Sequence, residues 1–104
     1  MLYNSGSPRG VVARTAPDPW GPWSAPVLVL DPARTGYGAF MHVKDAPDGL
    51  SDPGREHEWG GEYGPYVVDR YTRALPGGRA AVYFVLSTWN PYQVVEMRVV
   101  LQAE

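Results

Sequence analysis

Two short groups of residues carry the aromatic and polar side chains that sugar-binding sites use: Trp59, Glu62 and Tyr63 in one group, and Trp89, Asn90 and Tyr92 in the other. The apolar face of a sugar stacks on an aromatic ring, and Trp and Tyr also keep a polar atom for hydrogen bonding. A glutamate can bind hydroxyls or transfer a proton, and glycosidic cleavage needs two carboxyl groups roughly 5–9 Å apart. The residue types are compatible with contact with carbohydrate, and they assign no catalytic pair.

Three of these side chains also have a structural explanation. Glu62 can accept hydrogen bonds from backbone amides of the glycine-rich turn around it, and Trp89 and Tyr92 can pack within a turn. Turn packing is the simpler interpretation for Trp89 and Tyr92. Glu62 is the candidate for a carboxylate that binds sugar or acts as an acid or base.

Short strands separated by ordered turns are predicted along the chain. The 12 Gly and 11 Pro interrupt each window that could hold a helix, while the 4 Trp and 7 Tyr favour strands. Strands are expected at residues 2–4, 10–15, 27–30, 66–72, 80–86 and 93–102, with a brief strand-like piece at 40–43. The predicted fold class is therefore all-β with antiparallel strands.

Residues 80–86 are apolar at every position. A strand with one face in water should alternate, so this strand is expected in the middle of a sheet with packing on both faces. Stacked propeller blades provide that environment, and so does a small β-sandwich whose outer face is covered. Because the flanking turns are short, the loop before Tyr66 and the turn at 89–92 should lie at the same end of the sheet, where the six candidate residues would meet.

Composition excludes several classes of function. The 104 residues allow one domain at most, and the net charge of −2 with nine scattered basic residues offers no stripe for phosphates, so nucleic acid is not an expected partner. No apolar run approaches the roughly 20 residues of a membrane span, and the start of the chain does not resemble a signal peptide. The absence of cysteine excludes disulfides and thiolate metal sites but is compatible with any compartment.

One loop is rich in groups that bind metals: His42, Asp45, Asp48, Asp52, Glu56, His57 and Glu58. Carboxylates and imidazoles could together hold a cation. The spacing from Asp45 to Asp52 matches no calcium-binding loop, however, so no metal site is predicted. The sequence also lacks a phosphate-cradling glycine loop, so no cofactor is predicted.

Four runs of residues resemble a known family: 21–26 (GPWSAP), 61–66 (GEYGPY), 86–94 (LSTWNPYQV) and 97–98 (MR). They are similar to the C-terminal part of a bacterial domain-of-unknown-function family of five-bladed β-propeller, glycoside-hydrolase-like proteins. Some members of that family are endo-D-arabinanases that act on mycobacterial-type arabinan. The run at 87–93 is the more specific signal, whereas the run at 21–24 is similar to many sugar-cleaving propellers.

The resemblance implies about one and a half blades of a five-bladed propeller. Residues 1–30 would end a penultimate blade, residues 31–64 would form a long connecting loop on the ligand face, and residues 65–104 would form a last blade that lacks its outer strand. Family members are much longer than this chain, and their catalytic carboxylates come from several blades. No catalytic residue is therefore carried over.

By the same resemblance, the chain is expected to be a fragment of a secreted glycoside-hydrolase-like propeller that acts on or binds a furanoside polysaccharide such as arabinan. We expect no activity from the chain alone, an extracellular location for the full-length parent, and a polysaccharide or oligosaccharide as partner. Open sheet edges are expected to promote self-association. The alternative is a free-standing, non-catalytic β-sandwich that binds carbohydrate or a protein partner.

Overall fold

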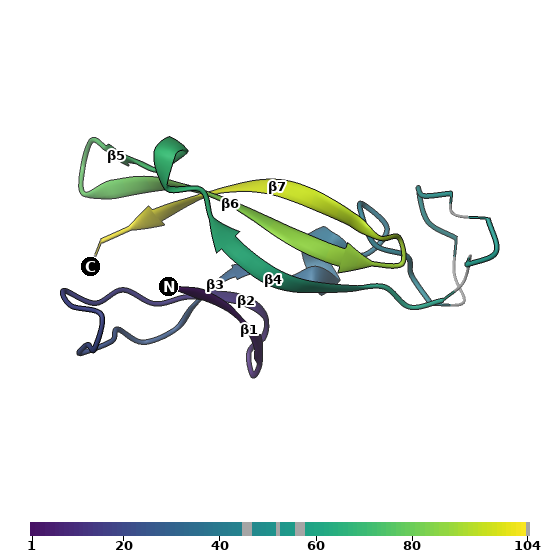
Figure 1. The fold of residues 1–104 in the computed structure, drawn as a ribbon, viewed down its shortest axis with the longest axis horizontal. Helices are drawn as coiled ribbons and strands as arrows, with labels where there is room; N and C mark the ends of the chain where they lie inside the picture. Colours follow the sequence, from purple (N-terminus) through teal and green to yellow (C-terminus); the bar gives the residue numbers. More distant parts are fainter. Residues whose placement is uncertain (45–46, 52, 56–57, 104) are drawn as a thin grey trace.

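The computed structural model describes residues 1–44, 47–51, 53–55 and 58–103. Two antiparallel sheets lie one against the other, the first from the N-terminal part of the chain and the second from the C-terminal part (Figure 1). The predicted fold class, all-β with antiparallel strands, is confirmed.

The N-terminal sheet is a three-stranded meander of β1 (Leu2–Gly6), β2 (Arg9–Ala13) and β3 (Val27–Leu30). β2 is the central strand, and its last four residues are buried. Gly10 has a φ of +131°, and a Cβ at this position would lie 2.1 Å from the backbone oxygen of Leu30. The close approach of β2 to β3 therefore requires glycine here.

The C-terminal sheet is built around β6 (Arg79–Trp89). β7 (Gln93–Gln102) pairs with β6 along one side, and β4 (Gly61–Val67) and β5 (Arg73–Leu75) share the other side. A 3-10 turn, η2 (Asp69–Tyr71), separates β4 from β5. The prediction that residues 80–86 lie in the middle of a sheet is confirmed.

The strand predicted at residues 66–72 has the wrong bounds. In the structure β4 begins earlier, and η2 interrupts the predicted stretch. Glu62 and Tyr63 consequently lie within a strand and not in the loop before it.

A bulge explains the earlier start of β4. Gly64 and Pro65 have the character of a turn, yet they lie between Tyr63 and Tyr66, where the register of β4 on β6 shifts. Proline is tolerated at a bulge because the extra residue needs no partner in the ladder. The strand therefore continues through a dipeptide that would end it elsewhere.

The hydrophobic core lies between the two sheets. Val11 and Leu30 of the N-terminal sheet contact Phe84 and Leu86 of β6, and all four are buried. Partly buried side chains complete the cluster: Leu2, Val29, Phe40, Val95, Met97 and Val99. Burial of each large apolar side chain stabilises the fold by roughly 1.5–3 kcal/mol, so this contact holds the sheets together.

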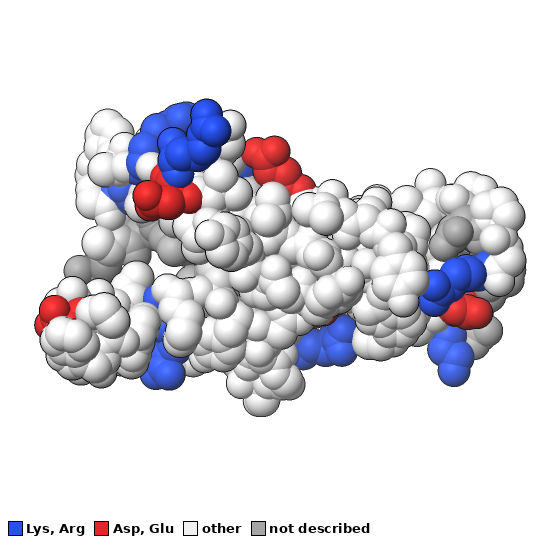
Figure 2. All heavy atoms as spheres, in the orientation of Figure 1, with Lys and Arg blue, Asp and Glu red and all other residues white. Residues whose placement is uncertain are grey.

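The opposite face of the C-terminal sheet is open within the described part of the chain. Tyr83 and Val85 of β6 are half-buried there, and their neighbours Tyr66 and Val94 are 72% and 69% exposed. Packing on both faces of β6 was expected, with this chain supplying only one of the two layers in full, and the described residues cover one face. Figure 2 shows charged side chains in separate groups around the margin of the visible surface, with an uncharged stretch across its middle.

The segment between the sheets begins with one turn of π-helix, η1 (Pro32–Gly36). Asp31 caps this turn, and its carboxylate accepts a hydrogen bond from the Ala33 amide at 3.0 Å. The strand-like piece expected at residues 40–43 is reduced to an isolated bridge between Tyr37 and Met41.

One backbone hydrogen bond ties this segment to the turn between β6 and β7, and a second joins two parts of the segment. The His42 amide donates to the Asn90 carbonyl at 3.1 Å, and the Gly60 amide donates to the His42 carbonyl at 3.2 Å. The molecule is elongated, with extents of 46 × 25 × 20 Å. Among the described residues, no helix has the length and apolar character needed to cross a membrane.

Candidate functional site

A cavity of about 350 Å³ lies where the β1–β2 hairpin meets the start of β4. Small-molecule sites commonly measure ≈ 300–1,000 Å³, so its size suits a small ligand. Both sheets and the segment before β4 contribute to its lining: Asn4, Ser5, Gly6, Arg9, Trp59, Gly61, Glu62 and Trp89. Three of the six predicted site residues, Trp59, Glu62 and Trp89, therefore meet in one place.

Two tryptophans form one wall of the cavity. The rings of Trp59 and Trp89 are 4.9 Å apart and meet edge to face at 72°, an arrangement that aromatic pairs prefer. The Trp59 indole N–H donates to the Tyr37 hydroxyl at 3.0 Å. A Cβ on Gly61 would lie 2.5 Å from Trp89 Nε1. The glycine thus makes room for Trp89, and the hydrogen bond holds Trp59 in place.

Arg9 and Glu62 supply opposite charges to the cavity. Arg9 Nη2 lies 3.5 Å from Glu62 Oε2, and the two side chains are 50% and 5% exposed. Glu62 Oε2 is buried and accepts no hydrogen bond from the described residues. Buried polar atoms in folded proteins almost always have a partner, so this oxygen is suited to accept a hydrogen bond from a ligand hydroxyl or from water.

Arg9 also contacts the aromatic wall. Its Nη2 donates to the Tyr37 hydroxyl at 2.6 Å, and its guanidinium carbon lies 5.1 Å from the centre of the Trp59 ring. A cation over an indole face is attracted by the ring's negative charge density. The Arg9 side chain therefore positions Trp59 and also faces the Glu62 carboxylate.

The chain matches the model of one family, described as Domain of unknown function (DUF4185), over residues 1–98. This chain belongs to the DUF4185 family. All residues that line the cavity fall inside the matched part of the DUF4185 chain. No curated protein matches the chain, and no solved structure does.

The other three predicted residues lie outside the cavity of the DUF4185 chain. Tyr63 follows Glu62 on β4 and points to the opposite face of the sheet, because successive side chains of a strand alternate. Asn90 is fully buried and donates from Nδ2 to the carbonyls of Arg55 at 3.2 Å and Glu58 at 2.8 Å. These hydrogen bonds give Asn90 a structural role in holding the preceding loop.

Tyr92 is an exposed residue of the turn between β6 and β7. The guanidinium carbon of Arg55 lies 5.3 Å from the centre of its ring. This contact is of the turn-packing kind that the sequence favoured for Tyr92. Trp89 of the same turn region, in contrast, reaches the cavity.

Sequence reasoning did not identify Arg9, Tyr37 or Asn4 as site residues. Asn4 contributes by donating from Nδ2 to the Glu62 carbonyl at 2.7 Å, which joins β1 to β4. The three residues come from the N-terminal sheet and the following loop, far in sequence from Glu62. No local pattern could have linked them to the carboxylate, because the link arises from packing between sheets.

The acidic loop of the DUF4185 chain contains a buried pair. His42 Nδ1 lies 3.0 Å from Asp48 Oδ2, and both side chains are almost fully buried. The amides of Val43 and Leu50 each donate to the Asp48 carboxylate at 2.9 Å, and these hydrogen bonds lower the pKa of Asp48. These contacts of Asp48 therefore link His42 and Val43 to Leu50 within the loop.

The remaining metal-binding candidates divide into two sets. Glu58 pairs with Arg55 at 3.4 Å, while Asp45, Asp52, Glu56 and His57 lie outside the described residues. Within the described part of the chain, no group of three metal-binding side chains comes together.

Proposed function

We propose that this DUF4185 chain binds carbohydrate in the cavity between the β1–β2 hairpin and β4. The observation that carries the proposal is the Trp59–Trp89 pair beside the buried carboxylate of Glu62. Aromatic rings offer a surface for the apolar face of a sugar, and a carboxylate next to a guanidinium can bind neighbouring hydroxyls by charge-assisted hydrogen bonds. Four of the eight lining residues, Asn4, Ser5, Arg9 and Glu62, carry polar or charged side chains, which suits a ligand with many hydroxyl groups.

The sugar class we propose is a furanoside polysaccharide such as arabinan. Support comes from the resemblance to endo-D-arabinanase-like proteins, which includes the runs at residues 61–66 and 86–94 and whose more specific signal lies at residues 87–93. The same two runs contribute Gly61, Glu62 and Trp89 to the cavity. The residues that carry the resemblance and the residues that could hold a sugar are thus partly the same.

The proposed activity of the chain is binding without cleavage. Glycosidic cleavage needs two carboxyl groups, and among the described residues Glu62 is the one carboxylate that lines the cavity. We further propose that the two sheets correspond to neighbouring blades of a glycoside-hydrolase-like propeller. In support, each sheet is an antiparallel meander, and the two pack face to face through Val11, Leu30, Phe84 and Leu86.

Isothermal titration calorimetry with arabinofuranosyl oligosaccharides tests the binding proposal. We expect saturable binding by the wild-type chain, and an increase in Kd of about tenfold for Trp59→Ala and for Trp89→Ala, since an aromatic contact contributes roughly 0.5–1.5 kcal/mol beyond its buried area. Xylo-oligosaccharides, whose sugars are pyranoses, test the preference for furanosides.

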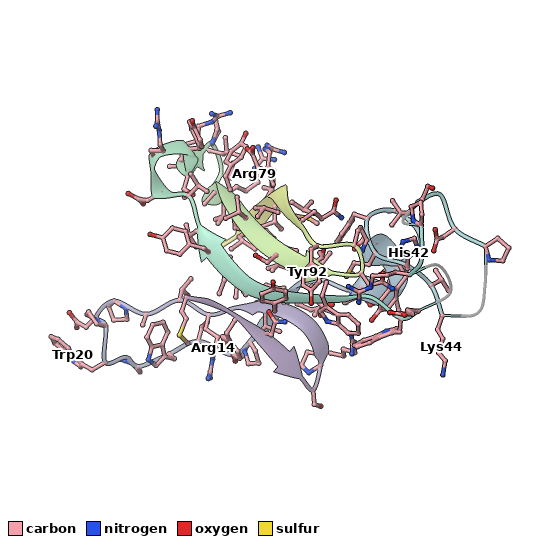
Figure 3. All side chains as sticks on the ribbon, turned by 45° about the vertical axis from the view of Figure 1, so that its right-hand side comes forward. Arg14, Trp20, His42, Lys44, Arg79 and Tyr92 are labelled. Carbon is pink, nitrogen blue, oxygen red and sulfur yellow. The ribbon has the colours of Figure 1, made fainter. Side chains whose placement is uncertain are left out.

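Trp20→Ala is the matched control for these variants. Trp20 is 82% exposed and lies at the opposite end of the molecule from His42, away from the cavity (Figure 3). This variant should bind like the wild type. Absence of binding to every oligosaccharide, or an equal effect of Trp59→Ala and Trp20→Ala, would contradict the proposal.

A further inference from the structure

β7 forms an open edge of the C-terminal sheet. It pairs with β6 over its whole length, and within the described residues it pairs with no other strand (Figure 1). β7 contains no proline, glycine or lysine, and its register on β6 is continuous. Natural edge strands are usually protected by proline, by charged side chains, by bulges or by short length. The two charged residues of β7, Glu96 and Arg98, have opposite signs, so β7 has the character of a strand that accepts a partner of complementary charge.

The hydrogen-bonding pattern shows which residues of β7 face this edge. The Ala103 amide donates to the Gly78 carbonyl at 2.9 Å, just beyond the paired residues Arg79 and Gln102. Bonded and non-bonded pairs alternate along an antiparallel ladder. The odd-numbered residues of β7 therefore exchange hydrogen bonds with β6, and the backbone groups of the even-numbered residues point away from β6: Val94, Glu96, Arg98 and Val100.

The sequence of β7 is symmetric about Met97. Residues 94–100 read VVEMRVV, so each valine has a counterpart at the same distance from Met97, and Glu96 has Arg98 as its counterpart. If two copies of β7 pair antiparallel with Met97 opposite itself, Glu96 of one copy lies opposite Arg98 of the other. Val94 then lies opposite Val100. The two strands are therefore complementary to each other in shape and in charge.

The charges of Glu96 and Arg98 favour this register over the neighbouring registers. The outward backbone groups require even-numbered residues to face even-numbered residues, so the nearest alternatives are shifted by two residues along the partner. One alternative places Glu96 opposite Glu96, and the other places Arg98 opposite Arg98. Like charges directly opposite each other destabilise a strand pair, whereas opposite charges stabilise it.

We propose that β7 pairs antiparallel with β7 of a second copy of this chain, which takes the place of the outer strand that the proposed last blade lacks, with Met97 on the two-fold axis. Four bonded residue pairs would supply about eight backbone hydrogen bonds and make one continuous sheet from the two C-terminal sheets. The partly buried side chains of Val95, Met97 and Val99 would extend the apolar inner face across the junction. β7 contributes no residue to the cavity, so this pairing does not depend on carbohydrate binding.

Charge exchange provides the first test, using the full chain and its mass in solution. The wild type should sediment at twice the monomer mass of 11.4 kDa. Glu96→Arg and Arg98→Glu each replace two attractive pairs by two repulsive ones, and each should raise the dimer Kd at least about tenfold. The double variant Glu96→Arg/Arg98→Glu restores opposite charges and should dimerise like the wild type.

Disulfide trapping provides the second test, because the chain contains no cysteine. Met97 would form a non-bonded pair with its own copy, with a Cα–Cα distance of about 4.5 Å, which a disulfide can span. Met97→Cys should therefore form a covalent dimer with oxidised glutathione. Val95→Cys is the matched control on the same face, since four residues of strand, about 13 Å, would separate the two copies of residue 95.

Three results would overturn the proposal. The first is a wild-type chain that stays monomeric at high concentration. This result would indicate that the edge of β7 pairs with a strand of different sequence. The second is a double charge variant that remains dissociated while it keeps the circular dichroism spectrum of the wild type. The third is cross-linking of Val95→Cys as fast as that of Met97→Cys.

Discussion

Glu62 Oε2 lies 3.5 Å from Arg9 Nη2, and this contact joins β4 of one sheet to β2 of the other at the edge of the cavity. The same guanidinium donates to Tyr37 and lies over the ring of Trp59. Arg9 therefore has two roles: it faces the buried carboxylate, and it holds the aromatic wall. Removal of Arg9 should lower the stability of the fold and should also disturb the positions of Tyr37 and Trp59 beside the cavity.

A double-mutant cycle measures the Arg9–Glu62 contact. Because Arg9 is half exposed, solvent screens the pair, and we expect a coupling energy of about 0.5–1 kcal/mol between Arg9→Ala and Glu62→Gln. Urea denaturation of the wild type, the two single variants and the double variant gives this energy. Strictly additive effects would show that the two charges do not interact.

Gly61→Ala should disturb the aromatic wall. The added methyl group would lie 2.5 Å from Trp89 Nε1, so Trp89 must move, at a cost of about 1–3 kcal/mol in the free energy of unfolding. Gly6→Ala is the control, because a Cβ on Gly6 meets no atom within 4 Å. Equal stability of the two variants would contradict the packing described for Trp89.

Phe84→Ala should destabilise the contact between the sheets. Phe84 is 1% exposed and packs in the core with apolar residues of both sheets. Loss of a buried phenylalanine side chain lowers the free energy of unfolding by about 3–5 kcal/mol. Val27→Ala removes a side chain that is half exposed on β3 and should cost much less. Thermal unfolding followed by circular dichroism compares the two, and similar melting temperatures would argue against this core.

Acid should weaken the loop that contains Asp48. The Val43 and Leu50 amides lower the pKa of Asp48 in the folded chain, so this stabilisation is present above the unfolded pKa of about 3.9 and is lost as the pH falls through the folded value. Urea denaturation between about pH 6 and about pH 2.5 should show the loss, and Asp48→Asn should show a weaker dependence on pH over that range. An identical pH profile for both proteins would contradict this role of Asp48.

Much of the secondary structure was predictable because it depends on local patterns. The bounds of the last strand, residues 93–102, agree with the structure, and so does the central position of residues 80–86. The start of β4 was not predictable in the same way. Gly64 and Pro65 have turn propensity, and only pairing with β6 makes them a bulge inside a strand.

The sequence by itself determined the all-β class, the alternation of faces on β7 and the aromatic and carboxylate residue types of the candidate site, because these depend on side-chain chemistry and on the two-residue period of a strand. Only the tertiary structure decided which candidates meet. It placed Trp59, Glu62 and Trp89 around one cavity with Arg9, turned Tyr63 to the face of β4 opposite Glu62 and buried Asn90 as a loop anchor. The physical reason is that packing of one sheet on another brings together residues far apart in the chain, and no local spacing encodes such contacts.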